Sequence, residues 1–283
     1  MNISIIGGDS RIVELIKLLA KDKNEICLFG FGQCAELKEF KQASNLDEAL
    51  QKAKIVISSI PLSKNGKNIN TPFTEKTILI EDFFEKAKNK IIITGNITDE
   101  IKEQIKNEND NEIIDVLKYE ELTVMNVIPT AEGAIQIAME KSNITLHDSN
   151  CLVLGFGRIG KILSKMLSGL GAKVYCEARK QQDLAWITAY GYNAIDLKNL
   201  KQRLNEFDFI FNTIPCLILD KENLQLIKKD CVLIDLASKP GGIDFDEANR
   251  LGLQTNWALA LPGKVAPKTS AKYIYDIVKQ IIW

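Results

Sequence analysis

Three glycines, Gly155, Gly157 and Gly160, have the spacing G-x-G-x-x-G and directly follow an apolar run at residues 151–154. Apolar residues continue beyond them at helical spacing, so the glycines are expected in a turn between a strand and a helix. In such a turn the first glycine bends the chain, the second lets the backbone approach a pyrophosphate, and the third allows close helix–strand packing. The pattern predicts a dinucleotide site; the alternative is a glycine-rich turn without a ligand.

The end of the next expected strand, in the sequence KVYCEARK that starts at Lys173, indicates which dinucleotide binds. An NAD site usually has an acidic residue here, which accepts hydrogen bonds from the ribose 2′-hydroxyl. Ala178 falls at that position and is followed by Arg179 and Lys180, which favour the 2′-phosphate of NADP. A register shift of one residue would place Glu177 there and favour NAD, but strand alternation points Glu177 to the opposite face. A solvated basic turn is the third interpretation.

Further polar segments follow other expected strands: NTIP at residues 212–215, DLASKPGG at 235–242 and ALALPGKVAPKT at 258–269. The carboxyl ends of parallel strands line the crevice where a dinucleotide binds, although proline and glycine also occur in ordinary turns. The residues expected to contact NADP are Gly155, Gly157, Arg158, Ile159, Gly160, Arg179, Lys180, Thr213, Ile214, Pro215, Asp235 and Ala237.

The elements that must position these residues are indicated by short apolar runs that alternate with amphipathic stretches. Successive strand–helix–strand units imply right-handed crossovers and parallel sheets with helices on both faces. The strands expected in the first half are 3–6, 26–29, 55–59, 91–94 and 113–116, and those in the second half are 151–154, 173–177, 207–213, 231–235 and 254–257. We predict an α/β chain of two Rossmann-like, doubly wound parallel-sheet domains with an interdomain cleft.

Helical patterns set the expected domain boundaries. The sequence TAEGAIQIAMEK at residues 130–141 predicts a connecting helix capped by Thr130, followed by a hinge at 143–150. We therefore expect a flavodoxin-like or Rossmann-like substrate domain at residues 1–128, a connection at 129–150 and an NADP-binding domain at 151–265. Apolar spacing within 266–283 predicts a last helix that packs back on the first domain.

Composition excludes several other functions. A net charge of -1 with 46% hydrophobic and 26% charged residues is typical of a soluble protein with no excess charge for nucleic acid or membrane lipid. The six cysteines form no C-x-x-C pair and are expected to be reduced core thiols, and the single histidine, His147, argues against a metal site. The start of the chain has no secretory signal pattern, and no apolar run reaches the roughly 20 residues of a membrane span, so we expect a cytoplasmic protein.

Six motifs taken together resemble the A subunits of bacterial dipicolinate synthases. They are GGDSR from Gly7, IPTAEGAIQIA from Ile128, LGFGRIGK from Leu154, and the NTIP, DLASKPGG and ALPGKVAPKTS segments. The resemblance covers essentially the whole chain, and IPTAEGAI and DLASKPGG are more specific to it than the glycine pattern. It implies an enzyme that oxidises dihydrodipicolinate to dipicolinate, a spore metabolite, with a pyridine nucleotide and a separate B subunit. It also implies the two-domain architecture of formate and glycerate dehydrogenases.

Within that broader architecture, hydroxyacid dehydrogenases carry an arginine and a histidine where this chain has Ser238–Lys239 and Pro262–Gly263. Simple 2-hydroxyacid oxidation is therefore disfavoured. Aromatising a dihydropyridine needs only a weak base, and the site must mainly anchor two carboxylates. We expect Glu132 and Lys239 as catalytic candidates, although capping and the helix dipole explain Glu132 equally well. The substrate-binding candidates are Asp9, Ser10, Arg11, Ser59, Ser63, Thr130, Ser238, Gly241, Gly263, Lys264 and Thr269.

Two other functions remain open. The chain could be a dinucleotide-binding subunit without a complete active site until its B partner binds. It could also be an NADP enzyme of the shikimate dehydrogenase type, which requires a catalytic Lys/Asp pair in the first domain that the sequence does not assign. With the main interpretation we expect a small dicarboxylate substrate, NADP, a B subunit as partner and a homo-oligomer.

Overall fold

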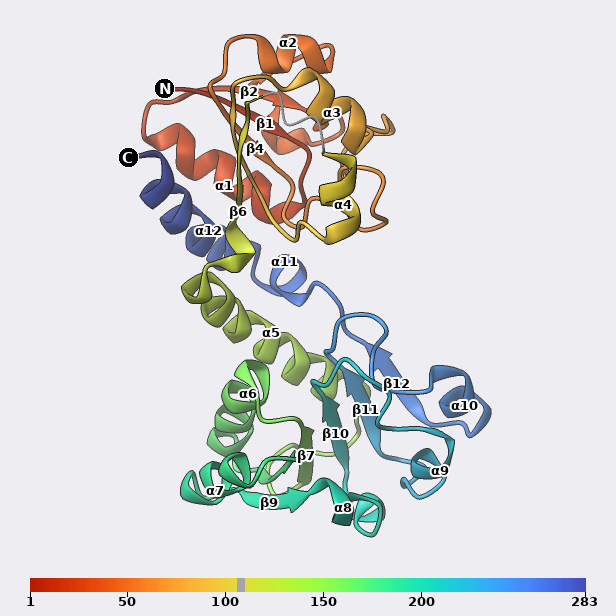
Figure 1. Cartoon of the computed structure of the whole chain (residues 1–283). Coiled ribbons are helices and arrows are strands. Elements are labelled where there is room, and N and C mark those ends of the chain that lie inside the picture. The colour runs from red at the N-terminus through yellow and green to blue at the C-terminus, as the bar shows by residue number, and fades with distance from the viewer. Residues whose placement is uncertain (106–109) are drawn as a thin grey trace. The chain divides into compact units, whose positions relative to one another are not determined.

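The computed structural model describes residues 1–105 and 110–283, which form two units, each built around a six-stranded parallel sheet (Figure 1). The first unit comprises Met1–Asn126 together with Ala266–Trp283, and the second comprises Val127–Val265. The predicted α/β fold with two Rossmann-like domains is confirmed.

In the first unit the strands are ordered β3-β2-β1-β4-β5-β6, and every pairing is parallel. The strands are β1 (Asn2–Ile6), β2 (Glu25–Phe29), β3 (Lys41–Gln42), β4 (Ile55–Ser58), β5 (Ile91–Thr94) and β6 (Glu112–Asp115). The helices are α1 (Ser10–Lys21), α2 (Leu46–Gln51), α3 (Ile80–Lys86), α4 (Asp99–Gln104) and α12 (Pro267–Ile282), with short 3-10 turns η1 (Ala35–Leu37) and η2 (Val116–Lys118).

The central strands β1 and β4 of this sheet are mostly apolar and mostly buried because helices cover both of their faces. Ile3 and Ile5 of β1 belong to a core formed with α1 and α12, whereas Ile6 belongs to a second core formed with α2, α3 and α4. The C-terminal helix α12 thus packs against α1, and Tyr275 donates a 2.7 Å hydrogen bond from its hydroxyl to Asp22.

In the second unit the strands are ordered β12-β11-β10-β7-β8-β9, again all parallel. The strands are β7 (Asn150–Leu154), β8 (Lys173–Ala178), β9 (Asn193–Asp196), β10 (Phe209–Asn212), β11 (Val232–Asp235) and β12 (Gln254–Trp257). The helices are α6 (Arg158–Gly169), α7 (Gln181–Ala189), α8 (Leu197–Leu200), α9 (Lys221–Leu224), α10 (Phe245–Arg250) and α11 (Leu261–Val265), with the 3-10 turn η3 (Leu204–Glu206).

One predicted element is wrong at its start. The connecting helix α5 spans Glu120–Lys141 and contains Pro129, so Thr130 is inside the helix and does not cap it. Proline lacks an N–H donor and its ring crowds the carbonyl group four residues earlier, but the residues on both sides of Pro129 remain helical. Ala131, Ala134 and Ala138 of this helix are buried in the core of the second unit.

The thiol prediction needs a partial correction. All six cysteines are free, and Cys34, Cys151, Cys176 and Cys231 are buried, but Cys27 is half-buried and Cys216 is exposed in the loop after β10. Burial raises the pKa of the Cys151 and Cys176 thiols to about 12. Over the described ranges, no helix has the length and apolar character required to cross a bilayer.

Candidate functional site

The glycine-rich turn connects β7 to α6, as the sequence predicts. Gly155 has a φ of +89°, which favours glycine, and its N–H donates a 3.2 Å hydrogen bond to the main-chain oxygen of Glu177 in β8. A Cβ atom on Gly155 would lie 2.7 Å from the hydroxyl oxygen of Thr213. A Cβ atom on Gly160 would lie 2.1 Å from the carbonyl oxygen of Gly155. These two glycines are therefore required by the fold itself.

Gly157 differs because nothing in the described protein needs it to be glycine. It has extended backbone at the N-cap of α6 and offers no side-chain cap, and a Cβ placed on it would find no described heavy atom within 4 Å. The backbone N–H groups at the start of α6, a helix of 12 residues, can therefore be reached by a ligand past Gly157, where no side chain is in the way. A helix N-terminus of this kind suits a pyrophosphate, so these residues fit a dinucleotide.

The side chains at the end of β8 alternate between the two faces of the sheet, as predicted. Ala178 pairs with Asp196 of β9 and is the last residue of the strand, and Arg179 and Lys180 follow it as exposed residues. Glu177 is fully buried. Because Ala178 packs in the core beneath α6 and α7, Glu177 points to the opposite face, and no carboxylate occupies the position of Ala178.

Burial raises the pKa of Glu177, and the nearby backbone N–H of Gly155 and the positive charge of Arg179 offset part of that rise. Neither carboxyl oxygen of Glu177 has a hydrogen-bond partner among the described residues. A buried carboxyl group without partners is costly to ionise.

The loops after β10 and β11 are held together by Asp235, which is fully buried. Its Oδ1 accepts hydrogen bonds from the Asn212 amide (2.8 Å) and from the Ala237 N–H (2.9 Å), and its Oδ2 accepts one from the Gly242 N–H (2.7 Å). Gly241 has a φ of +84°, and a Cβ there would lie 2.9 Å from Oδ2. The carboxylate therefore shapes the 235–242 loop.

The remaining residues predicted at these strand ends lie in two environments. Thr213 is half-buried, and its hydroxyl donates a 2.8 Å hydrogen bond to the carbonyl oxygen of Leu154, which ties β10 to β7 beside the glycine turn. Ile214 is also half-buried. The predicted side chains that are exposed at these ends are Arg158, Pro215, Ser238 and Lys239.

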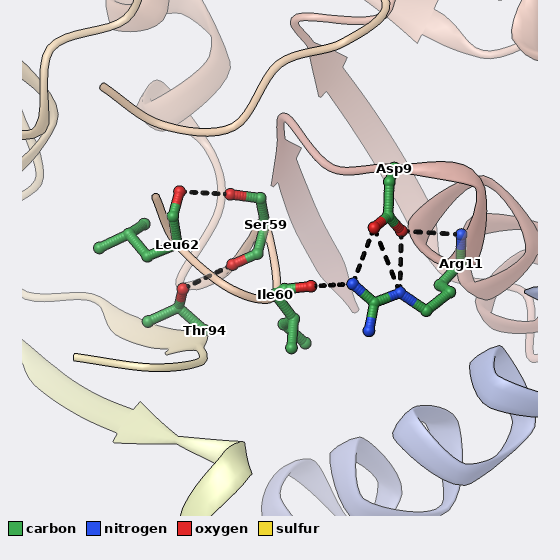
Figure 2. A network of polar contacts seen from close by, with 6 residues as sticks. All are labelled: Asp9, Arg11, Ser59, Ile60, Leu62 and Thr94. Atoms are coloured by element: carbon green, nitrogen blue, oxygen red, sulfur yellow. Dashed lines mark hydrogen bonds and ion pairs between the residues drawn. The ribbon is translucent and has the colours of Figure 1, made fainter. Parts of the chain in front are cut away.

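In the first unit, the turn after β1 holds a partly buried ion pair (Figure 2). Arg11 is 8% exposed and contacts Asp9 through Nε (3.0 Å) and Nη2 (2.7 Å). The same Nη2 donates to the carbonyl oxygen of Ile60 in the loop after β4. Asp9 also caps α1 by accepting a hydrogen bond from the Arg11 N–H. Arg11 thus links the carboxyl ends of β1 and β4, where the strand order of this sheet reverses.

The hydroxyl groups predicted near this turn are largely engaged by the backbone. Ser59 is buried and donates a 2.7 Å hydrogen bond to the carbonyl oxygen of Leu62, and Thr94 donates one of 2.8 Å to the carbonyl oxygen of Ser59 (Figure 2). Ser63 is buried and pairs with Asn65 at 3.1 Å. Ser10 is exposed.

The other predicted residues are distributed over both units. Glu132 is exposed within α5 and not at its start, so neither capping nor the dipole of the helix N-terminus acts on it. Gly263 and Lys264 belong to α11 of the second unit. Thr269 is an exposed residue of α12 in the first unit. No group of His, Cys, Asp or Glu residues suited to a metal is present in residues 1–105 and 110–283.

Sequence reasoning missed the role of Asn212. Its amide group bonds Asp235 and also donates to the carbonyl oxygen of Ile214 at 3.0 Å, and its oxygen accepts from the Ile214 N–H at 3.1 Å. The signal was present as NTIP, but the partner lies in another strand and only the sheet brings the two together.

Comparisons with known proteins agree with this geometry. Residues 2–117 match the family described as the N-terminal domain of the dipicolinate synthase A subunit, and residues 130–240 match the NAD binding domain of D-isomer specific 2-hydroxyacid dehydrogenases. The second match supports an oxidoreductase with a nicotinamide dinucleotide cofactor.

Full-length relatives give the same result. The dipicolinate synthase A subunit of Bacillus subtilis is 30% identical over 100% of this chain and 96% of its own length. The crystal structure of the corresponding protein from Bacillus halodurans aligns with a TM-score of 0.89 at 30% identity, covering 99% of this chain and 97% of that one. The crystal structure of the Bacillus subtilis protein aligns with a TM-score of 0.86 at 29% identity, covering 100% and 95%. The chain therefore belongs to the family of dipicolinate synthase A subunits.

Proposed function

We propose that this protein is the A subunit of a dipicolinate synthase and oxidises dihydrodipicolinate to dipicolinate, with NADP as the dinucleotide. The observation that carries the proposal is the full-length similarity to the dipicolinate synthase A subunit of Bacillus subtilis, combined with an intact dinucleotide turn in the second unit. The open face of Gly157 and the uncapped start of α6 support binding of a pyrophosphate there.

The choice of NADP is supported by the end of β8. Ala178 removes the carboxylate that an NAD site would use, and Arg179 is exposed directly after it. When bound, the dinucleotide supplies the acceptor for the hydride that the dihydropyridine ring loses together with a proton. Arg179 and Lys180 would hold the 2′-phosphate by charge-assisted hydrogen bonds.

The protein's main task toward the substrate is to anchor two carboxylates. We propose that the 8–11 turn, the 238–242 segment and the 262–269 segment supply the groups that bind the substrate's carboxylates. Lys239 is exposed within the 235–242 loop, which Asp235 fixes. Arg11 is preorganised by Asp9. Glu132, which is exposed on α5, is our candidate for the base.

A second candidate function is a dinucleotide-binding subunit that is inactive without a partner. The names of the relatives support it, since each is described as one subunit or one chain of a synthase. The two candidate functions differ in whether the isolated chain catalyses the oxidation without a partner.

The test is to supply enzymatically made dihydrodipicolinate to the purified chain, alone and with the B subunit, with NADP or NAD, and to follow reduced nicotinamide and the pyridine product. Turnover by the chain alone with a preference for NADP supports the first candidate. Turnover only with the B subunit supports the second. No formation of the pyridine product in any combination would contradict both.

A further inference from the structure

Glu177 is a buried group that the proposed function leaves unused. It is an acidic residue two positions before Arg179, in the strand that ends at the expected 2′-phosphate site. It is fully buried, and neither carboxyl oxygen has a hydrogen-bond partner in the described part of the chain. A charged carboxylate in this environment would be unfavourable for folding and would also repel a phosphate nearby.

The surroundings of Glu177 contain few charges. It pairs in the sheet with Leu154 of β7 and Ile195 of β9, both buried apolar residues. The two charged groups that act on it are Arg179, which favours its ionised form, and Asp196 of β9, which disfavours it. The side chain of Asp196 accepts a hydrogen bond from the Lys198 N–H and so caps α8, which fixes its position.

On the same face of β8, Tyr175 lies two residues before Glu177, and the guanidinium of Arg203 stacks over its ring with its carbon 4.9 Å from the ring centroid. Arg203 is paired with Glu206 at 2.6 Å. The positive charge of Arg203 is therefore neutralised by Glu206, and Arg179 remains the cation that interacts with the ionised form of Glu177.

We propose that Glu177 is a specificity-determining residue of the dinucleotide site, uncharged while Arg179 binds the 2′-phosphate and opposing that phosphate once it ionises. This inference rests on the proposed NADP site and adds its regulation by pH. Burial raises the pKa of Glu177 above its ordinary value, so the neutral form persists to a higher pH than for an exposed glutamate. Preference for NADP over NAD then falls as the pH rises through the pKa of Glu177.

The test compares the ratio of the NAD and NADP dissociation constants from pH 5.5 to 9 for the wild type and for Glu177→Gln, which is uncharged at every pH. The 2′-phosphate itself ionises near a pKa of about 6, but it does so equally with both proteins. We expect the two curves to coincide at low pH and the wild-type NADP preference to fall about tenfold below that of the variant at high pH. Arg179→Ala should abolish the NADP preference at every pH.

A second measurement does not depend on the variant folding. Binding linkage is reciprocal, so saturating NADP should raise the pKa of Glu177, followed by carboxyl-carbon NMR on the wild type, whereas NAD should leave it nearly unchanged. Parallel preference curves for wild type and Glu177→Gln, or a Glu177 pKa that NADP does not move, would overturn the inference and leave the NADP site standing. A wild type that never prefers NADP would instead overturn the proposed cofactor, and this inference with it.

Discussion

Gly157 is the residue whose substitution should change dinucleotide affinity without changing the stability of the fold. Its missing side chain leaves open space in the protein, whereas a side chain on Gly160 would collide with the carbonyl oxygen of Gly155. We predict that Gly157→Val lowers dinucleotide affinity by about 100-fold or more, because the side chain fills the space of the pyrophosphate, and leaves the melting temperature nearly unchanged. Gly160→Ala, the matched comparison, should lower the melting temperature. Calorimetry and thermal unfolding check both, and undiminished affinity in the folded valine variant would show that the turn does not bind the dinucleotide.

Arg179 should carry most of the discrimination between cofactors. A charge-assisted hydrogen bond contributes about 1.5–3 kcal/mol, so Arg179→Ala should weaken NADP about ten- to a hundredfold and leave NAD nearly unchanged. Lys180→Ala should have a smaller effect in the same direction. Titrations with each dinucleotide measure the constants, and equal losses for both cofactors would point to a structural role for Arg179.

At the scale of elements, the loops after β10 and β11 depend on one buried carboxylate. Replacing Asp235 with alanine leaves the Ala237 and Gly242 N–H groups without their acceptor, which should cost about 3 kcal/mol or more of unfolding free energy. The control is Asp246→Ala, an exposed aspartate in the first turn of α10, where a few tenths of a kcal/mol are expected. Urea denaturation compares the two, and equal losses would show that the loop does not need Asp235.

In the two described sheets, every central strand was predicted from the sequence, and so were the edge strands β6 and β12, but the other two edge strands were not. Central strands such as β7 and β10 are continuous apolar runs, and all predicted strands overlap observed ones. The strands β3 and β9, which are the ones missed, lie at the sheet edges and are largely polar, because an edge strand is half exposed. The start of α5 was misplaced because Thr130 is a residue type that favours the N-cap position, whereas the helix begins at Glu120 and continues through Pro129.

Those features of the candidate site that depend on local sequence patterns could be predicted, and those that depend on contacts between strands could not. The turn at Gly155–Gly160 and the alternation that separates Ala178 from Glu177 are local patterns, and the structure has both. The burial of Glu177 without a partner and the Asn212–Asp235 bond depend on contacts between strands. No local pattern in one sequence specifies such contacts.

At the scale of the whole molecule, the proposed carboxylate anchors include residues of each unit, whereas the proposed cofactor contacts all belong to the second unit. Lys239→Ala should therefore raise KM for the dicarboxylate about tenfold, since a cation is lost from the anchor, and leave NADP affinity intact. Lys229→Ala is the control, because Lys229 precedes β11 and donates to the carbonyl oxygen of Leu251 at 2.5 Å. Arg11→Ala should also raise KM for the dicarboxylate, but because it breaks the ion pair with Asp9 it should in addition lower the melting temperature. If Lys239→Ala or Arg11→Ala lost both NADP affinity and substrate affinity, the proposal that different residues bind the two ligands would be contradicted.

The proposed activity couples the oxidation of dihydrodipicolinate to the reduction of NADP in this protein. The most direct measurement is the stoichiometry of NADPH and dipicolinate formed under anaerobic conditions, where air cannot oxidise the dihydropyridine. We predict one NADPH for each dipicolinate, and neither product with the Gly157→Val variant. Dipicolinate formed without NADPH, or formed equally fast with that variant, would contradict the coupling.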